Sequence, residues 1–232
     1  MVLTDFLTGI ADAIREKKGT SDPINAQDFA DEIRGLSAGG GDNLLAKYMD
    51  GTKTEITESD LAGVTTLRAS AFRGNVVLTK ISMPDTITSI GLNLCDGCSA
   101  LKEVKFSSNL GAILGYAFTG CSNLLEVNLA NTKANDIGIY AFNNCKALKK
   151  VVVGERLKSI GAGAFNSANS LDVLDCRKST TIISLSNANA FTSVPSTCKV
   201  IIPDNLYDSW ISSTNWSALT VTYVKASGYT EA

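Results

Sequence analysis

The chain has 232 residues, 44% of them hydrophobic and 19% charged, with a formal net charge of −2. This composition is sufficient to bury a core and excludes the intrinsically disordered class. The sequence lacks the basic run of a nucleic-acid groove and the ~20-residue apolar run of a membrane span, so we expect neither nucleic acid nor membrane insertion.

Residues 1–36 are predicted to form a helical hairpin that attaches the chain to a partner or to itself. Apolar residues recur at helical spacing on both sides of a turn at Thr20-Ser21-Asp22-Pro23. The positions expected to contact the partner are Phe6, Ile10, Ile14, Phe29 and Ile33. Such a hairpin has too little core to stand alone, and the Gly-rich segment 37–42 favours a tethered module. The alternative is a cap docked on the end of the following array.

Residues 43–60 are predicted to cap the N-terminal end of that array. Asp50-Gly51 lies between an apolar run and a Thr-rich run, which indicates a turn or a hairpin. A repeat array needs a cap because an open end would expose both core and strand edges.

Residues 61–203 repeat one unit with a period of about 23 residues. An aromatic slot recurs at Phe72, Phe118, Phe142, Phe165 and Phe191, with Cys95 in the missing position. Nine residues after each slot come Ile81, Val104, Val127, Val151, Leu174 and Val200. Eleven residues after it come Met83, Phe106, Leu129, Val153, Cys176 and Ile202. This spacing predicts a short strand with one inward face, repeated along a solenoid.

A second apolar position lies five residues before each slot. It is occupied by Leu67, Ile90, Ile113, Ile137 and Ile160. A glycine follows it at Gly91, Gly138 and Gly161, where we expect the chain to bend sharply.

The outward strand positions are predicted to form a ladder on one face. They are Lys80, Ser82, Glu103, Lys105, Glu126, Asn128, Lys150, Val152, Val173 and Asp175. The ladder is either a ligand surface or an ordinary solvated face, and it lacks the Trp, Tyr and Arg that binding hot spots favour.

Three cysteines, Cys98, Cys121 and Cys145, occupy one slot of successive repeats and are predicted to form a buried, reduced column. The pair Cys95 and Cys98 has the C-x-x-C spacing of metal and redox sites. The repeat register explains the pair as core positions, and the chain has no histidine to complete a zinc site.

Residues 204–232 are predicted to cap the C-terminal end with a short helix after Asp204 and a strand over 219–224. This segment concentrates aromatic residues, and the candidate recognition residues are Tyr207, Trp210, Trp216 and Tyr223. They are interpreted either as packing of the cap or as a distal recognition patch for a glycan or a protein.

The unit Ile137–Val153, with Ala141-Phe142, Cys145 and Leu148 in register, resembles the BspA-like leucine-rich repeat. This resemblance covers residues 61–203. It implies an α/β repeat solenoid of short β-strands and turns, here preceded by an N-terminal α-helical hairpin. It implies little about function, because repeat scaffolds host many binding roles.

A further resemblance concerns the N-terminal hairpin. Ile10–Gly19 and Phe29–Ile33 look like a short module of bacteriophage and prophage proteins, and Ile202–Tyr207 resembles the closing segment of such proteins. The resemblance implies a virion-associated structural protein of tail, fibre or baseplate type. Fibres of that kind are often trimeric, which leaves a homotrimer open.

No catalytic residue, cofactor or metal ligand set is predicted. Without histidine the chain cannot build a Ser-His-Asp or Cys-His arrangement, and it has no phosphate-binding glycine loop. We therefore expect a protein without enzymatic activity.

The functional expectation is a virion protein that presents its solenoid for host-surface recognition. Its partners would be other virion proteins or itself, through the hairpin, and a host cell-surface protein or glycan. It would be made in the bacterial cytoplasm without a signal peptide and located in the virion. The alternatives are a bacterial surface adhesin, located at the cell surface, or a general protein-binding repeat module. A glycan-active enzyme is disfavoured because no carboxylate pair can be placed across a cleft.

Overall fold

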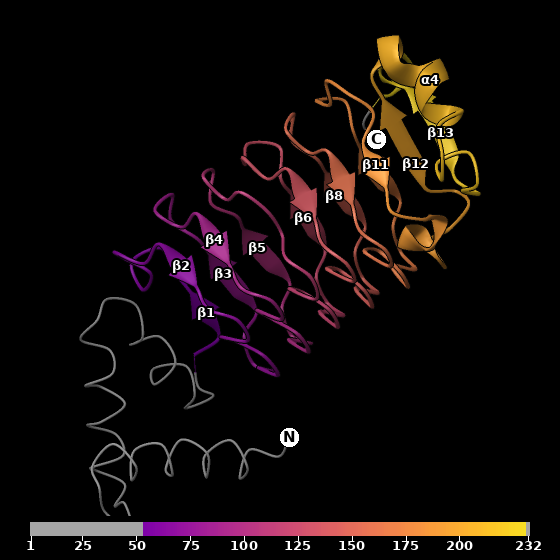
Figure 1. The fold of residues 1–232 in the computed structure, drawn as a ribbon. Helices are drawn as coiled ribbons and strands as arrows, with labels where there is room; N and C mark the ends of the chain where they lie inside the picture. The colour runs from indigo at the N-terminus through magenta and orange to yellow at the C-terminus, as the bar shows by residue number, and fades with distance from the viewer. Residues whose placement is uncertain (1–52, 231–232) are drawn as a thin grey trace, which may run out of the picture. The chain divides into compact units, whose positions relative to one another are not determined.

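The computed structural model describes residues 53–230, which form a solenoid whose coils stack in chain order from β1 to β13 (Figure 1). The predicted repeat solenoid is confirmed, and paired strands extend it beyond the predicted bounds of 61–203 at both ends. The predicted hairpin over 1–36, the linker over 37–42 and most of the predicted cap over 43–60 lie outside the described residues.

A first ladder of parallel strands runs along the solenoid, in two hydrogen-bonded parts of three and five strands. Its strands are β1 (Glu55–Ile56), β3 (Lys80–Ser82), β5 (Glu103–Lys105), β6 (Glu126–Asn128), β8 (Lys150–Val152), β10 (Val173–Asp175), β12 (Lys199–Ile202) and β13 (Thr222–Lys225). Equivalent residues pair across coils, as Val127 does with Val151 and Val151 with Leu174. These inward residues are buried, so the predicted strand register is confirmed.

A second parallel ladder forms at the position where the sequence predicted only a bend. Its strands are β2 (Thr66–Leu67), β4 (Ser89–Ile90), β7 (Asp136–Ile137), β9 (Ser159–Ile160) and β11 (Ser184–Leu185). An isolated bridge joins Ile113 to Ile137. The apolar residue of each strand is buried, which gives every coil a second inward face.

The glycines after these strands permit close contact between coils and do not supply an unusual backbone angle. Gly161 illustrates the reason, because a Cβ there would lie 2.6 Å from the backbone nitrogen of Ile139. Its own N–H donates to the carbonyl of Ile137 at 2.7 Å. The left-handed residues lie elsewhere in the coil, and they include Gly97 and Gly120 in the turn after the aromatic slot. The expectation that Gly91, Gly138 and Gly161 mark sharp bends is therefore corrected.

A column of stacked aromatic rings forms the centre of the core. Ring centroids are 5.4 Å apart from Phe118 to Phe142, 5.5 Å from Phe142 to Phe165 and 5.3 Å from Phe165 to Phe191. Trp216 continues the column, with its ring 5.8 Å from that of Phe191. The backbone N–H of each slot from residue 72 to residue 165 also donates to the next coil, as Phe142 does to Ala164 at 2.8 Å.

The aromatic column is interrupted in the coil that carries Cys95. Phe106 of the same coil is buried, and its ring meets that of Phe118 edge-on at 5.6 Å. The strand ladder divides at the same place, because β5 pairs with β3 and β6 pairs with β8 but the described strands include no pairing of β5 with β6. The backbone of the turn remains bonded there, with the N–H of Cys95 donating to Ala117 at 2.7 Å.

The C-terminal segment closes the stack. It contains η3 (Asp204–Leu206), α4 (Tyr207–Ile211) and η4 (Ala226–Gly228), and it follows the last aromatic slot, which lies on η2 (Ala188–Phe191). The helix predicted after Asp204 is found as the 3-10 helix η3 followed by α4, and Asp204 is the first residue of η3. The final strand, predicted over 219–224, is β13 at Thr222–Lys225, and it adds to the ladder in parallel register with β12.

The cysteine column is buried, and each thiol has a backbone acceptor in the preceding coil. Cys98 donates to the carbonyl of Phe72 at 2.9 Å, and Cys121 donates to that of Cys95 at 3.3 Å. Cys145 repeats the pattern with Phe118. All six cysteines are free and buried. The repeat register thus explains Cys95-x-x-Cys98, as the sequence indicated.

The native protein is expected to react slowly, at all six thiols, with an aromatic disulfide reagent. Burial raises the pKa of the Cys95, Cys121 and Cys176 thiols and raises that of Cys198 to about 12. The thiolate, which is the reactive form, is therefore scarce at neutral pH. Thiol titration should give values near zero in buffer and near six in denaturant. Rapid labelling of even one thiol in the native state would contradict the buried column.

Candidate functional site

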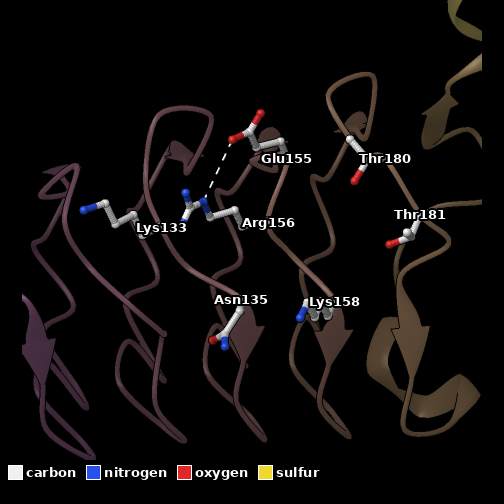
Figure 2. A pocket seen from close by; sticks show the side chains of 7 residues that line it. All are labelled: Lys133, Asn135, Glu155, Arg156, Lys158, Thr180 and Thr181. Atoms are coloured by element: carbon white, nitrogen blue, oxygen red, sulfur yellow. Dashed lines mark ion pairs between the residues drawn. The ribbon is translucent and has the colours of Figure 1, made fainter.

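The candidate site is a hollow on the loops that join the first ladder to the second. It has a volume of about 460 Å³ and is lined by Lys133, Asn135, Glu155, Arg156, Lys158, Thr180 and Thr181. A neighbouring hollow of about 600 Å³ shares Lys133, Glu155 and Arg156 with it. Figure 2 shows that Lys133 lies on one side and Thr180 and Thr181 on the other, with Arg156 between them.

Loop length explains why the hollow forms at this place. The connections from the first ladder to the second span residues 129–135, 153–158 and 176–183 in three successive coils. The middle connection is the shortest, so it forms a floor between two longer rims. Gly154 allows the rim and floor to approach closely, because a Cβ there would lie 2.6 Å from the carbonyl oxygen of Leu129.

Backbone hydrogen bonds of the second ladder hold the lining residues in register. The N–H of Lys158 donates to the carbonyl of Asn135 at 2.7 Å, and the carbonyl of Lys158 accepts from Ser184 at 2.8 Å. Lys133 and Arg156 each lie four residues before the buried residue of their strand. They therefore occupy equivalent positions in neighbouring coils, where strands lie ~4.8 Å apart.

The charge of the two hollows is strongly positive although the chain as a whole is negative. Their cations are Lys133, Arg156, Lys158 and Lys178, against the single carboxylate of Glu155. Arg156 Nε lies 3.9 Å from Glu155 Oε1, and both side chains are largely exposed. Among residues 53–230, neither Lys133 nor Lys158 has an ion-pair partner. The site therefore carries an excess of positive charge that its own acid does not balance.

Lys178 links the two rims of the hollow. Its ammonium donates to the carbonyl of Ala130 at 3.3 Å and to Asn131 Oδ1 at 3.2 Å, across the intervening coil. On the rim that it reaches, Thr132 Oγ1 donates to the carbonyl of Leu129 at 2.9 Å. These bonds fix the shape of the rim, so Lys178 is a positioning residue in this arrangement.

The sequence reasoning did not find this hollow. A signal was present in the repeat register, because Lys133 and Arg156 are equivalent loop positions and Lys158 is a cation two residues further on. Outward positions can be assigned from the sequence within the strands, where side chains alternate regularly, but the loops after the strands have no such alternation.

The predicted outward ladder is confirmed for most of its positions. Lys80 and Glu103 form an ion pair of 2.7 Å along it, and Lys105 pairs with Glu58. Asp175 is the exception, because it is only 5% exposed. Arg177 holds its carboxylate with bonds of 2.7–3.1 Å and packs over the ring of Tyr229. Burial acts to raise the pKa of Asp175, but the hydrogen bonds and charge of Arg177 bring it below its usual value.

The four candidate recognition residues of the C-terminal segment lie close together in a cap, where the two tryptophans form its interior. Trp210 and Trp216 are fully buried and pack edge-on, with ring centroids 5.4 Å apart. A recognition patch that needs their rings exposed is therefore wrong for these two residues. The physical reason is that Trp216 covers the end of the aromatic column, which would otherwise face water.

The two tyrosines of this group are half-buried and hydrogen-bonded within the cap. Tyr207 donates its hydroxyl proton to the carbonyl of Tyr223 at 3.3 Å, and Tyr223 donates to that of Trp216 at 2.5 Å. Burial, with the neighbouring Tyr207, raises the pKa of Tyr223 to about 12. A role in recognition for these two residues stays a prediction. The attachment residues Phe6, Ile10, Ile14, Phe29 and Ile33 lie outside the described residues.

A stacked pair of tyrosines, with Tyr116 exposed and Tyr140 half-buried, is a second feature that the sequence reasoning missed. The rings of Tyr116 and Tyr140 lie 5.4 Å apart, two residues before the aromatic slots of successive coils. Both residues have a left-handed backbone, with φ of 58° and 51°, which is unusual for bulky side chains. A Cβ at Gly163 would lie 2.3 Å from the Tyr140 ring, so this glycine makes room for the pair.

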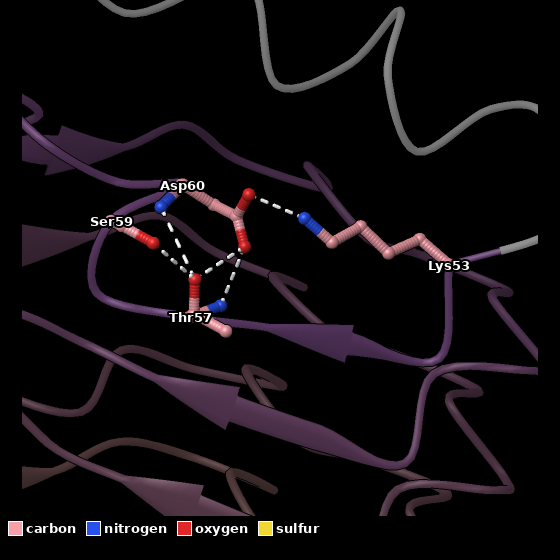
Figure 3. A network of polar contacts seen from close by, with 4 residues as sticks. All are labelled: Lys53, Thr57, Ser59 and Asp60. Carbon is pink, nitrogen blue, oxygen red and sulfur yellow. Dashed lines mark hydrogen bonds and ion pairs between the residues drawn. The ribbon is translucent and has the colours of Figure 1, made fainter.

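A polar network closes the turn after β1 (Figure 3). Asp60 Oδ2 accepts from the backbone N–H of Thr57 at 2.8 Å and from its hydroxyl at 2.7 Å, while Oδ1 accepts from Lys53. Lys53 and Thr57 together lower the pKa of Asp60 well below its ordinary value. The part of the predicted N-terminal cap that the structure describes is thus a strand and a hydrogen-bonded turn, and β1 pairs in parallel with β3.

Replacing Asp60 by Asn is expected to reduce the dependence of stability on acid pH. Because the native pKa is lowered, the carboxylate stabilises the fold fully above about pH 4, the ordinary range of Asp. This contribution is lost as the pH falls from there towards the native pKa. Urea unfolding at several pH values should show a shallower decline below pH ~4 in the variant. At neutral pH the substitution should lower the free energy of unfolding by less than about 1 kcal/mol. If the free energy of unfolding of the two proteins changes identically with pH, the role given to Asp60 is wrong.

The chemistry available to the hollow is binding through charge and hydrogen bonds. Within residues 53–230, no group of three or more His, Cys, Asp or Glu side chains could hold a metal ion. Nor does that part of the chain contain a helix long and apolar enough to span a membrane.

Comparisons with known proteins agree with the coil geometry. The sequence profile of the family described as "BspA type Leucine rich repeat region (6 copies)" matches residues 65–197 and 130–222. No curated protein matches the chain.

Several solved bacterial structures are similar to the chain. A leucine-rich repeat protein from Bacteroides ovatus is 25% identical, with a TM-score of 0.57, over 75% of this chain and 42% of that chain. A leucine-rich repeat protein from Eubacterium ventriosum is 28% identical, with a TM-score of 0.52, over 62% of this chain and 43% of that chain. The pneumococcal vaccine antigen PcpA, at 17% identity, a TM-score of 0.56 and coverage of 75% and 41%, shares the fold.

The chain spans about two fifths of the length of each of these three structures. The profile matches cover more than half of the chain, and they coincide with the coils that repeat the aromatic slot and the two ladders. The chain therefore belongs to the BspA-type leucine-rich repeat family.

Proposed function

We propose that this chain is a non-enzymatic recognition protein whose solenoid binds a ligand on a cell surface. The observation that carries the proposal is the positively charged hollow, which is built from three successive coils and held by ladder hydrogen bonds. A preformed polar hollow suits binding, because little ordering is required when the ligand arrives.

The finer proposal is that the protein is part of a bacteriophage particle, as a tail, fibre or baseplate component. It is supported by the resemblance of Ile10–Gly19 and Phe29–Ile33 to a module of phage and prophage proteins. In this proposal residues 1–36 attach the chain to other virion proteins or to itself, with a homotrimer as one assembly, and the solenoid contacts the host.

A bacterial surface adhesin is the second candidate. Its support is that the similar structures from Bacteroides ovatus and Eubacterium ventriosum are leucine-rich repeat proteins of bacteria. In this case the solenoid would bind a neighbouring cell or a host tissue, and the chain would be located at the bacterial surface.

Two measurements test the proposal and separate the candidates. Fluorescently labelled protein should bind intact cells of a susceptible species and saturate with concentration; absence of saturable binding to every surface tested would overturn recognition. Purified particles from an induced producer strain should contain the polypeptide if it is a virion protein. Its presence only on washed producer cells would favour the adhesin.

Deletion of residues 1–36 tests the attachment role. The truncated chain should remain soluble and keep the circular dichroism of the solenoid, but it should no longer enter particles or form oligomers in light scattering. Normal assembly of the truncated chain would show that the attachment role is wrong.

A further inference from the structure

We infer that the hollow formed by Lys133, Asn135, Arg156, Lys158 and Thr181 binds an acidic polysaccharide through its anionic groups. This inference rests on the proposed recognition function and names the ligand class of that site. It commits to carboxylate- or sulfate-bearing sugar chains.

Charge complementarity is the first argument. The two adjoining hollows hold four cations and one carboxylate, whereas the entire chain has a net charge of −2. The positive field is therefore a local property of these loops, and an anion is attracted there even though the protein as a whole repels it. Within residues 53–230, Lys133 and Lys158 have no ion pair that a ligand would need to break.

The arrangement of the cations is the second argument. Lys133 and Arg156 project from equivalent positions of neighbouring coils, and Lys158 lies on the same connection as Arg156. The ladder spacing of ~4.8 Å separates their backbones, which is comparable to the length of one sugar unit. A polymer with one anionic group on each sugar can therefore meet successive cations along the solenoid axis.

The uncharged lining residues favour a sugar over other polyanions. Asn135, Thr180 and Thr181 offer amide and hydroxyl groups that can exchange hydrogen bonds with sugar hydroxyls. The lining contains no aromatic side chain. Single-stranded nucleic acids are bound by stacking bases on aromatic rings. Protein interfaces concentrate their binding energy in Trp, Tyr and Arg, and of these three residue types the lining holds Arg156 alone.

The roles of the basic residues differ. Lys133 and Lys158 are expected to contact the anionic groups directly, because the described residues give them no competing ion pair. Arg156 is partly engaged by Glu155 at 3.9 Å. Lys178 holds the rim through its bonds to Ala130 and Asn131, so it acts by positioning.

The test uses the full chain and a matched pair of double variants. Lys133→Ala with Lys158→Ala removes two cations from the hollow. Lys146→Ala with Lys149→Ala removes two exposed cations of the same solenoid that do not line it. Both double variants lose two positive charges, so any difference in their affinity for the sugar is due to the location of the lysines that were removed. Circular dichroism and the melting temperature verify that both variants fold.

The probes are an oligogalacturonate, a heparin-derived oligosaccharide, a neutral dextran oligosaccharide and a single-stranded DNA of equal charge. Calorimetry should show that the wild type binds at least one acidic sugar at about 0.15 M salt and binds it more weakly at higher salt. The hollow variant should bind it at least about tenfold more weakly, which is about 1.4 kcal/mol. The control variant should bind like the wild type. The two acidic probes distinguish carboxylate from sulfate as the preferred group.

Several outcomes would overturn the inference. They are failure of both acidic sugars to bind, equal losses in the two variants, equally tight binding of dextran, or tighter binding of DNA. The binding site and the proposed recognition function can fail separately. If the hollow variant still binds cells saturably, the hollow is not the binding site, but the recognition function is retained. If the wild type binds acidic sugars but no cells, the recognition function is refuted.

Discussion

Phe142→Ala is expected to lower the melting temperature by roughly 6–20 °C. The side chain is fully buried, and its ring lies between those of Phe118 at 5.4 Å and Phe165 at 5.5 Å. Truncation of a buried Phe to Ala costs about 3–5 kcal/mol, and each kcal/mol shifts the melting temperature of a domain of this size by about 2–4 °C. The loss of stability should lie near the upper end of this range of free energies, because backbone hydrogen bonds fix the neighbouring coils and prevent them from collapsing into the cavity.

The matched control is Lys146→Ala, in the same coil. Its side chain is exposed, and surface substitutions usually change stability by less than about 0.5 kcal/mol. Differential scanning calorimetry of both variants measures the contrast. Small and equal effects would refute the inward register of the aromatic slot.

Trp216→Ala is expected to destabilise the solenoid by about 3–5 kcal/mol. Trp216 is fully buried between Phe191 and Trp210, and its indole N–H donates to the carbonyl of Ile183 at 2.6 Å. The substitution removes the ring that covers the aromatic column and also leaves a buried carbonyl without its donor. Guanidinium unfolding followed by far-ultraviolet circular dichroism measures the loss.

Trp216→Phe separates the two contributions. It keeps a ring in the column but removes the donor to Ile183, so its cost should be about 1–3 kcal/mol. Cell binding per folded molecule should be unchanged in this variant, because the ring is not at the surface. A stable Trp216→Ala protein, or a folded variant that has lost cell binding, would contradict the role of Trp216 as a cap residue.

The repeat register could be predicted from the sequence because equivalent residues recur at nearly constant intervals along the chain. Phe142, Val151 and Val153 recur at constant intervals, and a stack buries every equivalent position in the same manner. The column of Cys98, Cys121 and Cys145 followed from the same reasoning, and each of these thiols is buried.

Other features depend on how one coil meets the next, and spacing within a coil does not report that contact. The second ladder was interpreted as a bend, because a two-residue strand such as Ser159–Ile160 has no alternating pattern. Trp210 and Trp216 could equally be surface or core residues until the end of the aromatic column was located. The hollow arises from differences in loop length between neighbouring coils, which become visible only when the loops are aligned in register.

The divided strand ladder has a mechanical consequence. Between β5 and β6 the coils share no strand pairing, and beside these strands the N–H of Leu125 donates to Lys102 at 3.2 Å, whereas on the turn side the N–H groups of Cys95 and Gly97 donate to Ala117 and Thr119 at 2.7 Å. A bending load applied across the solenoid should therefore open the strand side of this junction and leave the turn side intact. The hollow lies in the coils beyond the junction, so its shape should be preserved while the solenoid bends. A protein held at one end and bound to a surface through these coils could then absorb shear by bending without releasing its ligand.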